Sequence, residues 1–504
     1  MKKLLLLYTL LLIAAYSGVA AAGDTLAVTE HLSVWNRQNA QQNINPAFRG
    51  VAYAYSFSQL GCFYDYNHQQ QAYILQKGNG HSLLKIKGDS YKHLDKKQTV
   101  WGDASYTSGI RKNVKWNSTA DYELLYPYIL ADSLGGNLTT EQYAFGGGYA
   151  TRIASNVTLG LELRYRSEHE YRMRDPRPRS IVSDLSVMAG VQYNLSTYLV
   201  GAAVGFTRYK QIGSVAFYSE AGGISEYLMT GLGTIYERFT GNSAMLYDGE
   251  GWKGEVALAP AQPAGWFMSC LVSRNSYRRI VTSLNSLPLT TLYVSVLSAQ
   301  GGWRSQARYC CSVALGVDAS FREGVEHIAG DGEAAIFPII GHLSMYENTR
   351  RHIYARAMFG QPTGMWGSWY LSAQLGGTSH AAKYRYPQRT MDLETIYAGV
   401  ELQVAHPVGQ KQQLSWNGSG YYYGNVKSGL DLPLATDKPA LAHMMTYSFR
   451  YYSASYTVVS ANMRSDWRLR KSDLGLFAVV GGRYIQCSVS SQSTSLILSG
   501  GITF

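Results

Sequence analysis

The stretch that decides the fold is S-L-I-L-S-G-G-I-T-F, Ser495–Phe504. Successive side chains of an extended strand point to opposite faces of a sheet. One face of this strand would then hold five apolar or glycine residues: Leu496, Leu498, Gly500, Ile502 and Phe504. A last strand with such an outer face and an aromatic residue at its end is typical of bacterial outer-membrane β-barrels. We therefore expect these five residues to form the strand that closes a barrel and supports its assembly.

The other end of the chain has the pattern of a secretory signal peptide. Lys2 and Lys3 give a basic start, Leu4–Ala15 is an apolar run, and Ala20–Ala22 offers a cleavage site. The apolar run is too short for a stable membrane-spanning helix. We expect residues 1–22 to be removed on export, residues 23–50 to form a periplasmic N-terminal segment, and residues 51–504 to form the barrel in the outer membrane.

The composition agrees with a barrel and disagrees with other classes. The chain has 40 Tyr, 51 Gly and 10 Trp, and only 16% of its residues are charged, against about 25% in an ordinary soluble domain. No later segment has 18 uninterrupted apolar residues, so a helical membrane protein is excluded. The net charge is +11, but the basic residues are scattered between strands. This scatter favours contacts with membrane lipid and lipopolysaccharide phosphates over nucleic acid.

Alternation with a period of two recurs along the chain. The clearest case is Val157–Tyr165, with Val, Leu, Leu, Leu and Tyr on one face and polar residues on the other. Segments of about ten residues with this pattern, separated by turn residues, are typical of a transmembrane antiparallel β-barrel. Counting from Phe57 to Phe504 gives about 18 strands, and 14 or 16 strands remain open. The stretch Ile336–Gly360 fits one long strand or three shorter segments.

The connections alternate between short and long in the first half of the chain, which predicts short periplasmic turns and long extracellular loops. The short connections are expected at Arg152–Asn156, Asn194–Thr197, Pro260–Gly265 and Gly301–Gln306. The long polar stretches are Arg111–Thr140, Glu168–Ser183, Gln211–Ser243, Arg274–Thr290 and Gly424–Ala442.

An Asn-rich segment precedes the first strand. Trp35–Ala40 and Asn43–Phe48 are polar and turn-prone. Two interpretations remain open: a short helix and turn that plugs the periplasmic mouth or contacts a partner, and a simple leading tail.

Arginine is concentrated at one predicted extracellular loop. Arg172, Arg174, Arg177 and Arg179 occur within eight residues, together with Pro176 and Pro178. Guanidinium groups bind phosphate and carboxylate oxygens through paired hydrogen bonds. The hypothesis is a binding surface for an anionic ligand; the alternative is a clamp on lipopolysaccharide or a solvated loop.

Residue patterns for catalysis, metals or cofactors do not emerge. The chain lacks G-x-S-x-G, H-E-x-x-H and C-x-x-C, and its five Cys have no metal-like spacing. We therefore predict no enzyme, no metal and no cofactor, and leave the disulfide state of the cysteines open.

Four sequence segments resemble a family of Bacteroidota outer-membrane barrels of unknown biochemical function. They are Asp121–Tyr128, Gly146–Tyr149, Thr395–His406 and Gly420–Asp431. The resemblance implies a gene beside a TonB-dependent transporter and a surface lipoprotein, in loci for iron or siderophore acquisition. Those two proteins, outer-membrane lipid and the barrel-assembly machinery are then the expected partners.

Three functions remain in view. The first is a channel or accessory component of a nutrient-uptake system, with iron or siderophore as the implied cargo. The second is a structural or assembly scaffold without an open pore. The third, which the lack of catalytic motifs disfavours, is a hydrolase at the barrel rim.

Overall fold

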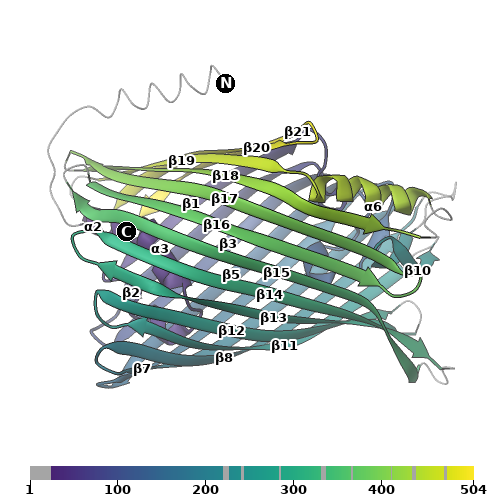
Figure 1. Cartoon of the computed structure of the whole chain (residues 1–504), viewed down its shortest axis with the longest axis horizontal. Helices are drawn as coiled ribbons and strands as arrows, with labels where there is room; N and C mark the ends of the chain where they lie inside the picture. Colours follow the sequence, from purple (N-terminus) through teal and green to yellow (C-terminus); the bar gives the residue numbers. More distant parts are fainter. Residues whose placement is uncertain are drawn as a thin grey trace.

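A single closed β-barrel of 18 antiparallel strands dominates the computed structural model (Figure 1). The structure describes residues 24–218, 226–239, 243–282, 285–330, 337–364, 367–409, 411–433, 439–469 and 474–504. Each barrel strand pairs with the next one along the chain, and β21 (Ser491–Thr503) pairs with β1 (Phe57–Gln69) to close the barrel. The fold class and the strand number of about 18 are therefore confirmed. The predicted signal peptide lies outside the described residues.

The remaining barrel strands are β2 (Gly80–His93), β3 (Gln98–Val114), β5 (Gly136–Ala154), β6 (Val157–Tyr171), β7 (Arg177–Asn194), β8 (Tyr198–Ala216), β11 (Ser243–Pro260), β12 (Ala264–Val281), β13 (Leu287–Gln306), β14 (Cys310–Ala329), β15 (Ile339–Gly364), β16 (Gly367–Tyr384), β17 (Arg389–Val408), β18 (Gln412–Asp431), β19 (Tyr456–Arg468) and β20 (Gly475–Cys487). A second, small sheet consists of β4 (Leu130–Asp132), β9 (Glu226–Gly231) and β10 (Thr234–Phe239). The helices are α2 (Asp24–Leu32), α3 (Val34–Gln41), α4 (Pro46–Arg49), α5 (Tyr122–Leu125) and α6 (Pro439–Tyr452), with a 3-10 turn, η1 (Leu75–Lys77).

The two ends of the barrel differ. At the end that holds Phe504 and helices α2 and α3, the connections are short, as in the two residues between β5 and β6 (Figure 1). We call this the turn end. At the opposite end, the loop end, the connections after β3, β8 and β18 contain α5, the small sheet and α6. The predicted division into short turns and long loops is therefore confirmed.

Several predicted loops and turns are strand in the structure. Glu168–Ser183 and Arg274–Thr290 are not long loops: β6 and β7 are joined by residues 172–176, and β12 and β13 by residues 282–286. Polar residues there continue the pairing of β6 with β7 and of β12 with β13, so polarity alone overstates the length of the loop. Gly301–Gln306 is the end of β13 rather than a turn, and the turn follows at residues 307–309. In the Ile336–Gly360 region the structure has one long strand, β15.

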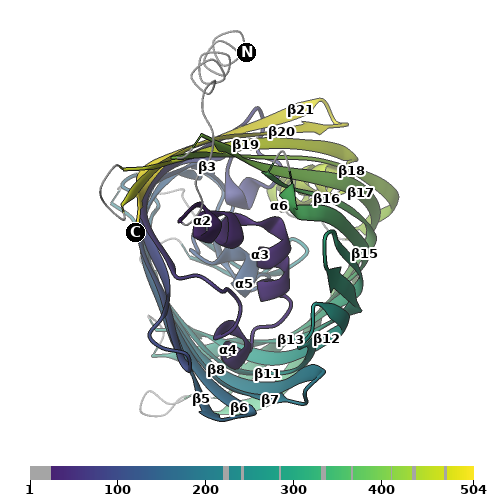
Figure 2. The same ribbon diagram turned by 90° about the vertical axis from the view of Figure 1, so that its left-hand side faces the viewer.

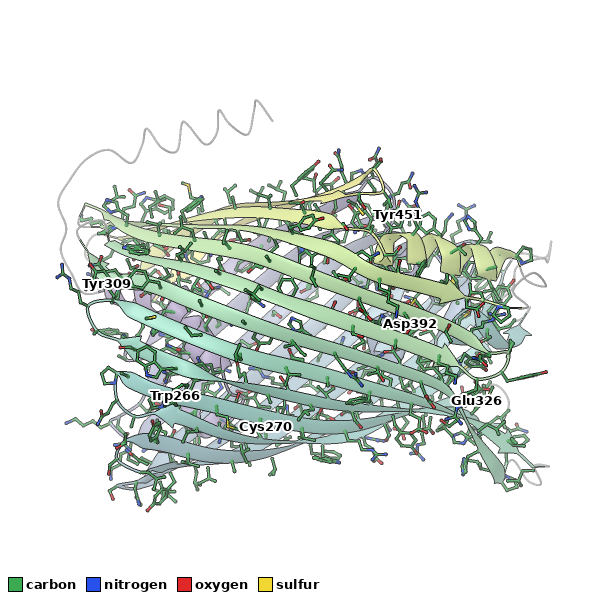
Figure 3. All side chains as sticks on the ribbon, viewed as in Figure 1. Trp266, Cys270, Tyr309, Glu326, Asp392 and Tyr451 are labelled. Carbon is green, nitrogen blue, oxygen red and sulfur yellow. The ribbon has the colours of Figure 1, made fainter. Side chains whose placement is uncertain are left out.

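The outer surface of the barrel wall is apolar at alternate positions. On β6, Leu159, Leu161 and Leu163 are all exposed, as the alternation of Val157–Tyr165 predicts. Trp266 and Tyr309 are exposed near the turn end (Figure 3). Aromatic side chains at the edge of an apolar band are typical of the girdles of membrane barrels. Among the described residues, no helix is long and apolar enough to cross a membrane.

The largest hydrophobic core of the described chain lies inside the barrel, at the loop end. Three connections fold inward and pack against the inner face of the wall. They contribute Leu125 and Ile129 from the β3–β5 connection, Leu228 and Met229 from β9, and Met444 from α6. Wall residues that complete this core come from β7, β8, β11, β12, β13, β15, β16 and β17. The loops therefore form a folded closure within the lumen, which we call the loop-end closure.

The N-terminal segment lies in the lumen at the turn end. Helices α2, α3 and α4 cross the interior of the barrel when it is viewed from that end (Figure 2). Helix α4 contacts β5, β6, β7 and β8. We call residues 24–56 the turn-end segment.

Candidate functional site

The turn-end segment is fixed to the barrel wall by Asn45, which is only 2% exposed. Its side-chain Nδ2 donates hydrogen bonds to the carbonyl oxygens of Val191 (3.0 Å) and Ala202 (3.1 Å). Its Oδ1 accepts a hydrogen bond from the backbone N–H of Ala47 at 2.9 Å and so caps α4, where Pro46 is the first residue. One side chain thus forms the cap of a helix and joins that helix to β7 and β8.

Three glycines of the wall make room for this attachment. A Cβ atom at Gly190 would overlap the side chain of Asn45, and one at Gly160 would overlap the backbone of Ala47. A Cβ atom at Gly201 would overlap the ring of Phe48. Gly160 and Gly190 are direct partners across β6 and β7. Because Gly160, Gly190 and Gly201 have no side chains, the wall has a depression into which residues 45–48 fit. We call these three glycines the glycine seat.

Further contacts hold the turn-end segment on both sides of the lumen. The carboxylate of Glu255 accepts the backbone N–H of Ile44 at 2.8 Å and 2.9 Å. On the opposite wall, Gln403 accepts from the N–H of Val34 at 2.6 Å and donates to the carbonyl of Leu32 at 2.9 Å. Trp35, 1% exposed, packs with Cys310, Met358 and Tyr370. The segment is a docked plug rather than a loose tail.

A chamber of about 1200 Å³ lies between this segment and the wall. It reaches from the rim at the turn end, where Lys96, Arg152 and Pro263 line it, to Arg164 and Lys253 further along the barrel. On its wall, Glu162 accepts hydrogen bonds from Arg164 Nε at 2.7 Å, Trp101 Nε1 at 2.9 Å and Arg49 Nη1 at 3.2 Å. This carboxylate joins the turn-end segment to the inner face of β3 and β6.

Arginine side chains of the wall hold the loop-end closure in place. Arg279, 1% exposed, donates to the carbonyl of Met229 at 2.9 Å, and Arg389 donates to the carbonyl of Leu232 at 3.0 Å. Arg322 donates to the carbonyl of Glu123 at 2.7 Å. The first two bonds satisfy carbonyl groups of buried residues, Met229 and Leu232, and a buried carbonyl group needs such a partner. The closure is therefore bound to the wall by polar as well as apolar contacts.

The four arginines that the sequence singled out do not form one surface. Arg172 is buried and pairs with Asp132 at 2.7 Å, inside the loop-end closure. Arg177 pairs with Asp175 at 2.7 Å and lies over the ring of Tyr218, and Arg179 donates to His169 at 3.1 Å. Arg174 is exposed. A ligand-binding role for the exposed members stays a prediction.

A buried carboxyl pair accompanies Arg172. Asp132 lies opposite Glu226 in the antiparallel pairing of β4 with β9, and both residues are fully buried. Ser118 donates to Glu226 at 2.9 Å and to Asp132 at 3.2 Å. Burial, together with the neighbouring carboxylate of Asp132, raises the pKa of Glu226 from 4.5 to about 8.

The predicted closing strand lies where β1 and β21 meet. Phe504 and Ser58 exchange two backbone hydrogen bonds, at 2.9 Å and 3.0 Å, and Leu498 and Ile502 are exposed on the outer face. The glycine seat and the chamber have no counterpart among the residues predicted from the sequence. The one local signal for the seat was Asn45 before Pro46, a pattern that begins a helix; its three glycine partners are more than 100 residues away.

A family model described as "Family of unknown function (DUF6850)" matches residues 46–504. No curated protein matches the chain. Among solved structures, a ferric enterobactin receptor (PfeA) mutant from Pseudomonas aeruginosa has 8% identity and a TM-score of 0.35, covering 88% of this chain and 80% of that chain. The siderophore receptor PiuA from Acinetobacter baumannii has 8% identity and a TM-score of 0.39, covering 89% and 82%. These values describe a distant likeness in architecture and say nothing about what this chain binds.

Proposed function

The chain belongs to this family of unknown function, and we propose that it is an outer-membrane barrel that serves as a closed accessory component of a nutrient-uptake system, not as an open channel. The exposed apolar positions of the wall and the aromatic side chains near the turn end support the membrane location. In that setting the wall contacts lipid and lipopolysaccharide, and the barrel-assembly machinery inserts it. The turn end faces the periplasm and the loop end faces the medium.

The observation that carries the proposal is the hydrophobic core inside the lumen. Residues such as Leu125, Leu228 and Met444, from three different connections, pack there against the wall. Each large apolar side chain that is buried contributes about 1.5–3 kcal/mol. A water-filled passage at this end would expose many of them at once. The loop-end closure is therefore a stable part of the fold rather than a weak gate.

Conductance in a planar lipid bilayer tests this proposal. We expect the purified barrel to insert without giving steady open-channel current, whereas a general porin handled in the same way gives stable current steps. Insertion is verified separately by the heat-dependent shift in gel mobility that folded barrels show. Steady current steps from the native chain would overturn the proposal.

The uptake context is the finer part of the proposal, and it comes from the family resemblance. It implies a TonB-dependent transporter and a surface lipoprotein as partners, and iron or a siderophore as cargo. We expect a deletion strain to grow more slowly when siderophore-bound iron is the sole iron source, and to recover when the gene is restored. Cross-linking in intact cells should recover the transporter with the barrel. Unchanged growth would contradict the iron context while leaving the closed barrel intact.

A further inference from the structure

We propose that the chamber at the turn end is a binding site for a soluble organic anion that carries at least two phosphate or carboxylate groups. The chamber is lined by eight Lys and Arg residues but only three Asp and Glu residues. The basic residues are Arg37, Arg49, Lys96, Lys97, Arg152, Arg164, Lys253 and Arg304. This site goes beyond the proposed function, because that function rests on the loop-end closure and the chamber lies at the turn end.

The three acidic residues are already bound by groups of the protein. Glu30 accepts the backbone N–H groups of Ala54 (2.8 Å) and Tyr55 (3.0 Å). Asp95 accepts two backbone N–H groups of its own turn, at 2.6 Å and 2.8 Å. Glu162 is shared between two arginines and Trp101. The acids therefore leave most of the basic groups unpaired.

Six of the eight basic residues have no acidic partner within 4.0 Å among the described residues. The two exceptions are Arg49 and Arg164, which share Glu162; Arg164 also lies 3.6 Å from Asp103. Lys253 donates to the hydroxyl of Ser186 at 3.1 Å, and Arg304 donates to the amide oxygen of Gln42 at 3.1 Å. Neutral oxygens satisfy donors without balancing charge. An anion in the chamber would supply that balance.

The arrangement of the basic groups favours a ligand with several charges. Ser186, the partner of Lys253, lies directly opposite Arg164 in the pairing of β6 with β7, so the two cationic side chains share one part of the wall. The Arg164 side chain is 47% exposed even though β6 turns it inward. Arg304 on β13 faces the chamber from another part of the wall. A single carboxylate cannot reach both places, whereas a molecule with two or more anionic groups can.

The position of the chamber determines where the ligand comes from. Lys96, Lys97 and Arg152 line it at the rim of the turn end, beside the turn-end segment. Walls of low dielectric constant concentrate the field of such a cluster and attract anions from the adjacent solution. Guanidinium groups then bind phosphate or carboxylate through paired hydrogen bonds.

Calorimetric titration of the full barrel in phosphatidylcholine nanodiscs tests the site. The probes are pyrophosphate and citrate, with maltose as the neutral control. We expect both anions to bind, with an affinity that falls steeply as salt is raised, and maltose not to bind. Lys253→Gln and Arg304→Gln should each weaken binding about tenfold, which corresponds to about 1.4 kcal/mol.

The matched control is Arg278→Gln, which removes the same charge at an exposed position paired with Asp248, outside the chamber. It should leave the affinity unchanged. The proposal is overturned if neither anion binds, or if all three variants weaken binding equally. Repeating the titration in phosphatidylglycerol nanodiscs separates a soluble ligand from a lipid headgroup: loss of pyrophosphate binding there would assign the site to the headgroup and overturn the soluble ligand. Conductance of the native chain would instead overturn the closed barrel, so the two failures are distinguishable.

Discussion

At the scale of single residues, Glu226 links the loop-end closure to pH. Its carboxyl faces Asp132, Arg172 and Ser118, and its pKa is raised from 4.5 to about 8 by burial and by Asp132. Between about pH 5 and pH 8 the folded closure keeps a proton that the unfolded segment releases. Folding therefore takes up a proton in this window, and the stability of the closure falls as pH rises.

We expect amide hydrogen exchange in β4 and β9, corrected for the intrinsic effect of pH, to be more strongly protected at pH 5.5 than at pH 8.5. Glu226→Gln retains an oxygen that can accept from Ser118 but cannot ionise, so its protection should vary little with pH. Equal pH dependence in the native chain and in this variant would show that another group is responsible.

At the scale of elements, the seam between β1 and β21 depends on a pair of glycines. Gly61 and Gly501 face each other there, and a Cβ atom at Gly501 would overlap the carbonyl oxygen of Leu60. Gly500, the next residue, has 3.6 Å between such an atom and the carbonyl oxygen of Phe477, an ordinary contact. Gly501→Val should therefore reduce the amount of folded barrel in the outer membrane by severalfold, because the two strands cannot close.

Gly500→Val on the same strand is the matched control and should assemble at the native level. The measurement is the fraction of chain that shows heat-dependent gel mobility in outer-membrane fractions. Normal assembly of Gly501→Val, or equal loss in both variants, would contradict the steric explanation.

The elements also show how far the sequence could predict this structure. Lipid is a uniform solvent, so it favours apolar side chains at every second position of a strand. Leu159, Leu161 and Leu163 show this period, and their exposure on the outer face could therefore be predicted from the sequence. The lumen imposes no such period. Leu125 and Leu228 are buried because connections far apart in the sequence meet inside the barrel, and nothing local marks them as part of a closure.

The same reason explains the arginine cluster and the turn-end segment. Arg172 lies in a stretch whose composition is typical of an exposed loop, yet its side chain is buried against Asp132, 40 residues away. Asn45 is polar and turn-prone, yet it is 2% exposed because β7 and β8 supply acceptors for its amide. Sequence patterns predict which face of a strand is exposed to the surrounding solvent. They do not predict contacts between distant residues that only the closed barrel brings together.

At the scale of the whole molecule, the turn-end segment and the loop-end closure lie in series along one lumen. The turn-end segment is held largely by hydrogen bonds and by the glycine seat, whereas the loop-end closure has a hydrophobic core. The turn-end segment narrows the lumen beside the chamber, whereas the loop-end core fills the lumen, so displacing the turn-end segment alone leaves the barrel closed. Gly190→Ala places a methyl group where the Asn45 side chain lies, so it should displace residues 45–48 from the seat.

We expect trypsin to cleave after Arg49 much faster in Gly190→Ala than in the native chain, and the bilayer current of this variant to stay at zero. Gly213→Ala is the matched control, because a Cβ atom there would lie 4.0 Å from its nearest neighbours on β7 and β11. Steady current should appear only when Gly190→Ala is combined with replacement of residues 119–131 by a short Gly-Ser linker, which removes part of the loop-end core. Current from Gly190→Ala alone would show that the turn-end segment is the sole barrier, and that the loop-end core leaves a path for ions.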